Sequence, residues 1–235
     1  MRILSIESSA KAASAAVLRD GQVEAYSFQN RGLTHSRTLL SMLEDMLKNS
    51  ELEMGGMDYI CAARGPGSFT GLRIGISAAK GLSLGSGIPC VGVSTLEAMS
   101  CIAPERDGII CCVMDARRGE VYNAIFLRDG EVGRITEDRA ISLGGLAEEL
   151  KTCGKEIICV GDAAKMCYNY LRERGIPAFL PAEDRTHQNA VGVALAAYKR
   201  IIGHGAAEDG DFSIAPVYLR LSQAEREKNE REKKI

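Results

Sequence analysis

The feature that most constrains the fold of this chain is an internal repeat at about half its length. Residues 3–23 and 109–132 each read as an apolar strand, an acidic residue at its end, a polar loop and a second strand. Both copies close on nearly the same hexapeptide, LRDGQV at 18–23 and LRDGEV at 127–132. The Asp-Gly pair is a strong signal for a two-residue hairpin turn. Self-similarity over this length predicts two duplicated domains.

Helices and strands alternate after each repeat. The apolar residues of 34–49 recur at helical spacing, 59–63 reads as a strand, and a second helix is expected over 70–84. Ser94 and Glu97 form a capping box, which predicts the start of another helix. In the second half we expect helices at 143–151, 166–175 and 188–203 and a strand at 157–160. Each half is β-β-β-α-β-α in outline, which predicts an α/β fold with two mixed sheets and flanking helices.

The repeat also sets the expected domain limits. We expect an N-terminal domain over residues 1–102 and a C-terminal domain over 103–221, joined closely because no low-complexity linker separates them. Residues 222–235 are almost all charged or polar and have no apolar face, so they read as a solvated charged tail.

Composition and charge exclude several classes of function. The chain has 235 residues, of which 46% are hydrophobic, enough apolar surface for folded domains. A net charge of −2 and the absence of Trp argue against a dedicated nucleic-acid binder, which is usually far more basic. No apolar run is long enough to span a bilayer, and the first strand is too short for a signal peptide. We therefore expect a cytoplasmic protein with no membrane role.

Neither a metal centre nor a hydrolase nucleophile is expected. The eight cysteines form no C-x-x-C pair and read as small buried hydrophobes, and the three histidines lack metal-ligand spacing. No G-x-S-x-G motif is present, which argues against a serine peptidase or esterase. We predict no catalytic residue, no metal and no cofactor.

A strand-end acid in each copy resembles the arrangement in actin-like ATPases and sugar kinases, where two glycine-containing loops hold phosphates and the acids organise Mg²⁺. The segment after the first strand, residues 7–13, contains no glycine that would let a phosphate approach its backbone. We therefore predict at most a vestigial nucleotide or anion site. Its candidate residues are Glu7, Ser8, Gly65, Gly67, Asp115 and Arg117. The alternative is an actin-like ATPase or small-molecule kinase that acts alone through Glu7 and Asp115.

The glycine-rich stretch 65–71 joins a strand to a helix without the Gly-Lys-Ser/Thr ending of a P-loop. It is either an anion site at a helix N-terminus or a tight turn with Thr70 as the N-cap. The helix that follows is rich in Gly and Ala, and each interior glycine costs about 1 kcal/mol relative to Ala. Such a helix approaches another backbone closely, either that of its own sheet or that of another subunit.

These segments together resemble the bacterial TsaB (YeaZ) family of tRNA threonylcarbamoyladenosine biosynthesis. The resemblance rests on ILSIESS at 3–9, His35-Ser36, the block RGPGSFTGLRIGISAAKGLSLGSGIPCVGVSTLEAMS at 64–100, DARRGEVY at 115–122 and PVYLR at 216–220. It implies two tandem actin-like (RNase H-like) domains. Glu7-Ser8 stands where the family more often has Asp-Thr, which makes a retained Mg²⁺ role still less expected.

The resemblance implies a non-catalytic scaffold subunit. It would pair with a TsaD-like catalytic subunit and a TsaE-like ATPase to modify adenosine 37 of tRNAs that read ANN codons, contacting tRNA only through the complex. It also implies a homodimer in isolation, and it places the partner or dimer interface on two helices of the N-terminal domain. Carried onto this chain, the expected interface residues are His35, Leu39, Leu43, Leu47, Leu72, Gly75, Ile76 and Ala79.

Overall fold

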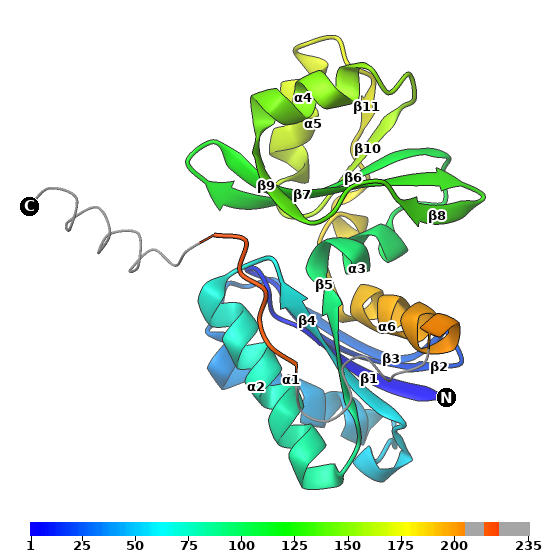
Figure 1. Cartoon of the computed structure of the whole chain (residues 1–235). Coiled ribbons are helices and arrows are strands. Elements are labelled where there is room, and N and C mark those ends of the chain that lie inside the picture. The colour runs from blue at the N-terminus through cyan, green and yellow to red at the C-terminus, as the bar shows by residue number, and fades with distance from the viewer. Residues whose placement is uncertain (205–213, 221–235) are drawn as a thin grey trace, which may run out of the picture.

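The computed structural model describes residues 1–204 and 214–220, which form two lobes stacked one above the other (Figure 1). Each lobe is built on one mixed β-sheet, and two helices lie between the sheets. None of the described helices is both long and apolar enough to cross a membrane.

The first sheet has five strands in the order β3-β2-β1-β4-β5. β1 pairs antiparallel with β2 and parallel with β4, so the sheet is mixed as predicted. The strands are β1 (Arg2–Glu7), β2 (Ala13–Arg19), β3 (Gln22–Gln29), β4 (Tyr59–Gly65) and β5 (Cys90–Ser94).

The second sheet repeats this order as β8-β7-β6-β10-β11, with β9 paired to β7 on the side. Its strands are β6 (Gly108–Arg117), β7 (Glu120–Asp129), β8 (Glu131–Arg134), β9 (Arg139–Ser142), β10 (Ile157–Val160) and β11 (Ala178–Phe179). Strand for strand the two sheets have one topology, so the sequence repeat reflects a repeat of structure. Both predicted Asp-Gly hairpins form, and Gly21 and Gly130 adopt the positive φ that such turns need.

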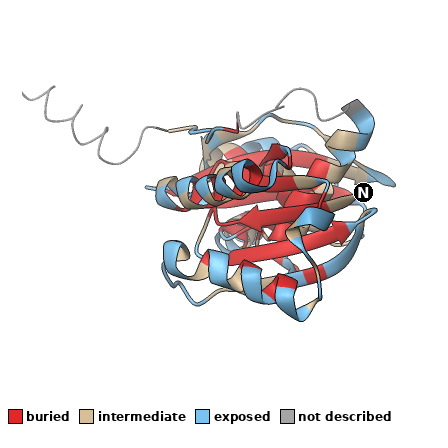
Figure 2. Ribbon diagram, turned by 90° about the horizontal axis from the view of Figure 1, so that it is seen from below, coloured by how far each residue is buried: buried red, intermediate tan, exposed pale blue. Residues whose placement is uncertain are grey.

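Helices cover both faces of each sheet, and the buried strands lie between exposed helix surfaces (Figure 2). In the first lobe, α1 and α2 cover one face and α6 the other. In the second lobe, α4 and α5 cover one face and α3 the other. The helices are α1 (His35–Asn49), α2 (Phe69–Ser86), α3 (Thr95–Ile102), α4 (Leu143–Lys151), α5 (Ala164–Arg172) and α6 (Ala190–His204), with short 3₁₀ turns at Met54–Gly56 and Glu183–Arg185. This two-lobed arrangement is the predicted actin-like fold.

Helix α6, which follows the second lobe in the sequence, returns to the first lobe. Helix α6 packs on β1 and β2, with Ala190, Val193 and Ala197 buried against Ile3 and Ala16. The expected second domain, 103–221, therefore contains a helix that packs on the first sheet. We propose that the first domain combines residues 1–102 with α6; the expected charged tail, 222–235, lies outside the described residues.

Two helix starts test the predicted caps. The Ser94 hydroxyl accepts the backbone N–H of Glu97 at 3.1 Å, which confirms Ser94 as the N-cap of α3, while the Glu97 carboxylate lies 3.4 Å from Arg134 Nη2. The expectation of Thr70 as the cap of α2 is wrong, because α2 begins one residue earlier and Ser68 Oγ accepts the N–H of Gly71. Strand β4 ends at Gly65, and Ser68 is the last residue before α2. Its hydroxyl can therefore accept an N–H of the first helical turn.

Candidate functional site

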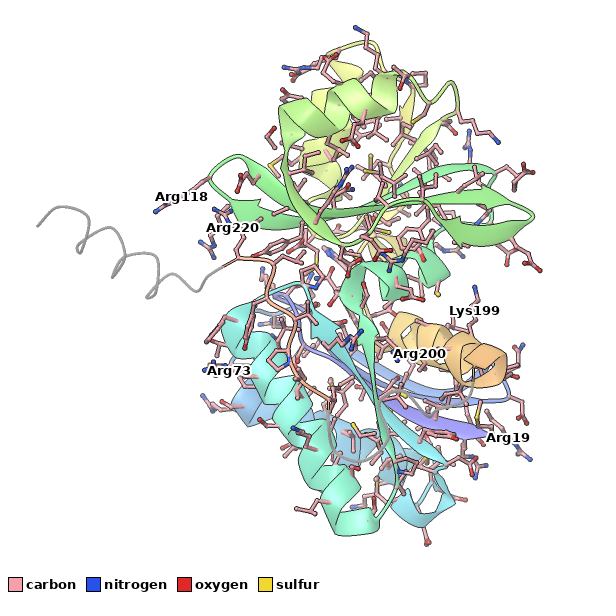
Figure 3. All side chains as sticks on the ribbon, in the orientation of Figure 1. Arg19, Arg73, Arg118, Lys199, Arg200 and Arg220 are labelled. Carbon is pink, nitrogen blue, oxygen red and sulfur yellow. The ribbon has the colours of Figure 1, made fainter. Side chains whose placement is uncertain are left out.

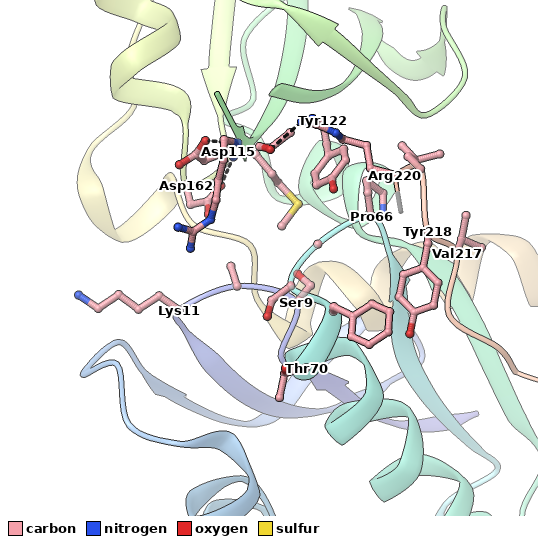
Figure 4. Close-up of a pocket in the computed structure, with 18 residues that line it drawn as sticks. Ser9, Lys11, Pro66, Thr70, Asp115, Tyr122, Asp162, Val217, Tyr218 and Arg220 are labelled. Carbon is pink, nitrogen blue, oxygen red and sulfur yellow. Dashed lines mark hydrogen bonds between the residues drawn. The ribbon is translucent and has the colours of Figure 1, made fainter. Parts of the chain in front are cut away.

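A cleft of about 770 Å³ lies where the two lobes meet. Its walls come from the loop after β1, the glycine-rich turn before α2, the turn between β6 and β7, and residues 217–220 (Figure 4). Of the six residues predicted for a nucleotide or anion site, Gly67, Asp115 and Arg117 line this cleft. Glu7, Ser8 and Gly65 lie behind its wall.

On the first-lobe side, the glycine-rich turn and α2 hold the loop after β1, residues 8–12, which we call the first loop. A Cβ on Gly67 would lie 2.5 Å from the carbonyl oxygen of Ser9, and Cβ atoms on Gly71 and Gly75 would overlap Ser8. The backbone N–H of Ser68 donates to Ser9 O at 2.6 Å. These glycines therefore let the first loop lie directly on α2. Of the two alternatives given for the small-residue helix, this is close packing within its own chain.

This packing removes much of the expected anion site. The Ser68 N–H is bonded within the chain, and the Ser68 hydroxyl caps α2. The Ser8 hydroxyl donates to the carbonyl of Gly71 at 2.9 Å. Gly65 packs on residues 214–220 and not on the first loop: a Cβ at Gly65 would overlap the carbonyl oxygen of Val217. The glycine-rich stretch thus acts mainly as a close-packing surface for other parts of the same chain.

The first strand-end acid, Glu7, is fully buried. Its Oε1 accepts the backbone N–H of Ser9 at 2.5 Å, and Oε2 has no hydrogen-bond partner among the described residues. Burial raises the pKa of Glu7 to about 7; the hydrogen bonds from Ser9 and Ser8 oppose this shift and the nearby Asp162 carboxylate adds to it. A buried carboxyl group that is about half protonated at pH 7 is a poor ligand for Mg²⁺.

The second strand-end acid lies in the open. Asp115 is exposed and lies near the end of β6; the name second loop is used here for residues 115–119, the last residues of β6 and the turn that leads to β7. Its Oδ1 accepts the N–H of Arg117 at 2.7 Å, and its own N–H donates to Asp162 Oδ1 at 3.2 Å. Arg117, Arg118 and Gly119 all have positive φ, so three successive residues are left-handed. Burial raises the pKa of Asp162 at the cleft floor.

The predicted interface residues lie mostly in the core. His35 is half-buried, and its Nε2 donates to the carbonyl of Ala10 at 2.7 Å, so it holds the first loop. The other seven are buried between α1, α2 and the sheet: Leu39, Leu43, Leu47, Leu72, Gly75, Ile76 and Ala79. These side chains pack inside one chain and are not accessible to a partner in this conformation, so their role in an interface stays a prediction.

The same helices expose a different set of residues. Leu40 of α1 is 52% exposed and Leu84 of α2 is 74% exposed, although both are large and apolar. On α2, Arg73, Ser77 and Gly81 also face outward. Sequence reasoning missed this face because Leu40 sits in the same apolar run as the buried Leu39. Only the one-residue offset around the helix separates the two.

Residues 214–220 are here called the strap; from the sequence, part of this segment carried the motif PVYLR but had no assigned role. They run from the first lobe past α2 to the second loop (Figure 1), and Val217, Tyr218 and Arg220 lie along one side of the cleft (Figure 4). The available signal was the motif PVYLR, which pairs an aromatic side chain with a cation. Among residues 1–204 and 214–220, no group of three or more His, Cys, Asp or Glu side chains is placed to hold a metal ion.

Comparison with known proteins supplies the biological context. A family model described as "TsaD: tRNA N6-adenosine threonylcarbamoyltransferase" matches residues 31–228. The protein called tRNA threonylcarbamoyladenosine biosynthesis protein TsaB in Escherichia coli (strain K12) is 42% identical over 131 residues, 55% of this chain and 56% of that relative. The match thus spans about half the length of the Escherichia coli relative. The protein of the same name in Bacillus subtilis (strain 168) is 27% identical over 227 residues, 96% of each chain.

A solved structure shares the whole fold. It is described as an uncharacterized protein with similarity to peptidase YEAZ from Pseudomonas aeruginosa, and it superposes with a TM-score of 0.76 at 25% sequence identity. The match covers 93% of this chain and 99% of that one, so the two-lobed arrangement extends over both proteins.

Proposed function

The chain belongs to the TsaB (YeaZ) family of tRNA threonylcarbamoyladenosine biosynthesis proteins, and from this we propose that it is a non-catalytic partner subunit in that pathway. The partners we propose are a TsaD-like catalytic subunit and a TsaE-like ATPase, with tRNA contacted only through the complex. We further propose that the chain forms a homodimer when alone and works in the cytoplasm.

The state of the cleft is the observation that carries the non-catalytic role. Its first strand-end acid is buried with a raised pKa, and the first loop that would face a phosphate is packed on α2. Phosphate sites in proteins use backbone N–H groups that point into open space. Here the Ser9 N–H points to Glu7 and the Ser68 N–H to Ser9 O. The exposed Arg117 and the backbone at Gly67 are what remains for the proposed anion site.

The docking face we propose is the outer surface of α1 and α2. It combines two exposed leucines, Leu40 and Leu84, with the small residues Ser77 and Gly81, which let a second helix approach closely. A contact of this kind buries apolar side chains that water otherwise surrounds. The same face would serve either a second copy or the TsaD-like subunit, so the two would compete.

The test is a binding measurement with the purified chain and the TsaD-like subunit of the same organism, followed by light scattering. We expect a dimer that converts to a one-to-one complex. Leu84→Arg should weaken both assemblies at least tenfold. Phe28→Arg, which changes an exposed apolar residue of β3, is the matched control and should leave both intact. Ala79→Arg is unsuitable because Ala79 is fully buried.

Two outcomes would contradict the proposal. Equal binding by wild type and Leu84→Arg would show that the outer surface of α2 is not part of the docking face. Steady ATP turnover by the purified chain alone, abolished by Asp115→Asn, would instead favour the ATPase or kinase alternative.

A further inference from the structure

The strap touches both lobes within seven residues. At its start, Ile214 is 2% exposed and packs in the core of the first lobe, where a Cβ on Gly92 would lie 2.9 Å from its Cγ1. Three residues later the N–H of Val217 donates to the carbonyl of Arg64 at 2.7 Å, so the strap lies beside the end of β4. The strap is therefore anchored in the first lobe by a buried side chain and a backbone hydrogen bond.

The middle of the strap is joined to the first turn of α2 by an aromatic stack. The Tyr218 ring lies on the Phe69 ring with centroids 4.6 Å apart and planes 25° apart. The guanidinium of Arg73 lies 3.8 Å from the Phe69 centroid, and its Nε donates to the Tyr218 hydroxyl at 2.9 Å. Ring stacking, a cation–π contact and a hydrogen bond thus meet at one point.

The end of the strap is bound to the second lobe. Arg220 Nη1 donates to the carbonyl of Ala116 at 2.8 Å and lies 2.6 Å from a carboxylate oxygen of Glu120. Ala116 is in the second loop and Glu120 directly follows it, and residues 115–117 of this loop line the cleft. Arg73 and Arg220 extend on the same side of the molecule (Figure 3).

We propose that the strap is a releasable joint between the lobes and that Tyr218 is its positioning residue. Tyr218 holds the strap on α2, and Arg220, two residues later, holds it on the second loop. The reason for release lies in the burial pattern. The anchor, Ile214, is in the core, whereas Tyr218 is 38% exposed, so the outer part can detach without unfolding either lobe. Arg73 contacts Tyr218 and Phe69 and is also exposed on α2. A change in the width of the cleft that moves Tyr218 would therefore also move Arg73 on the outer surface of α2.

Amide hydrogen exchange on the full chain tests this joint, because the decisive effects cross from one lobe to the other. In Tyr218→Ala, exchange should rise at least tenfold at residues 116–120 of the second lobe. In Arg220→Ala, it should rise at least tenfold at residues 69–73 of the first lobe. Tyr218→Phe, which keeps the stack, should stay within about threefold of wild type.

The matched control is Tyr26→Ala, which removes another exposed tyrosine whose ring lies 6.2 Å from a phenylalanine, here Phe28 on β3. It should change exchange at neither 116–120 nor 69–73. Effects of Tyr218→Ala and Arg220→Ala confined to the lobe that each side chain touches would overturn the proposal. If Tyr218→Ala exposes the core strands β1 and β6 to fast exchange, Arg220→Ala alone decides, since its side chain lies outside both cores. None of these measurements needs a partner protein, so a failed binding test leaves this inference standing.

Discussion

The first and second loops occupy the same place in two sheets of one topology, yet they differ in almost every physical respect. The first loop is mostly buried, lies on the glycines of α2 and follows a carboxyl group whose pKa burial raises to about 7. The second loop is mostly exposed, holds three left-handed residues and begins with an exposed acid. The comparison teaches that a duplicated fold can keep its strand order while one loop becomes internal packing and the other stays at the surface.

The largest expected change in stability comes from placing a side chain where the first loop contacts α2. A Cβ in Gly71→Ala would overlap the carbonyl oxygen of Ser8, so backbone must move, and we expect the free energy of unfolding to fall by about 3 kcal/mol. Thermal denaturation should show a melting temperature lower by roughly 10 °C. Gly81→Ala in the same helix is the control, because its Cβ meets nothing within 4 Å, and it should stabilise by up to about 1 kcal/mol. Equal effects of the two changes would contradict the packing role.

The next effect separates the two strand-end acids by pH. Glu7 keeps its proton in the folded chain up to a pKa of about 7, whereas the unfolded chain loses it near 4.5. Between these values the folded state binds more protons, so stability falls as pH rises, by about 1.4 kcal/mol per pH unit and about 3 kcal/mol in total. The loss is nearly complete by about pH 8, one unit above the folded-state pKa.

Glu7→Gln should therefore be more stable than wild type at pH 8 and lack this slope. Urea denaturation of wild type and Glu7→Gln at pH 5, 6, 7 and 8 measures this slope. An unchanged slope in Glu7→Gln would show that another group titrates.

A smaller effect is expected in the second loop. Gly119 has a φ of +76°, and a Cβ added there would meet nothing within 4 Å, so Gly119→Ala brings backbone strain without a clash. We expect a loss of about 1 kcal/mol, a third of the Gly71→Ala effect. A loss as large as that of Gly71→Ala would show that the second loop is packed as tightly as the first.

The smallest effect should have the opposite sign. Arg117 has a φ of +64°, which a glycine adopts more readily, so Arg117→Gly should stabilise the chain by about 0.5 kcal/mol. Denaturant midpoints compared with Arg19→Gly, a change at the exposed end of β2, would separate backbone relief from simple loss of charge. Destabilisation by Arg117→Gly would mean that its side chain makes a contact that matters.

Much of the fold followed from local patterns. The Asp-Gly turns, the helix over 143–151 and the strand over 157–160 were predicted at the observed bounds, because turn chemistry and hydrophobic period act over a few residues. The cap of α2 was misplaced by two residues, since both Ser68 and Thr70 suit a cap and only the end of β4 decides between them. Half of the predicted cleft residues do line the cleft. The predicted interface residues lie mostly on the inward faces of α1 and α2, whereas the docking face that we propose is the outward one; the sequence did not separate the two, because both faces of α1 contain leucine.

By itself, the sequence determined the duplicated α/β architecture, the family, and the presence of a small-residue helix after a glycine-rich turn. Those features rest on periodicity and on residues adjacent in the chain. Tertiary structure alone decided what the glycines accommodate, that Glu7 is buried, that α6 returns to the first lobe and that the strap joins the lobes. Each of these depends on a contact between segments far apart in sequence, such as Gly71 with Ser8 or Arg220 with Ala116. A residue's neighbours across such distances set its exposure and its pKa, and no local pattern encodes them.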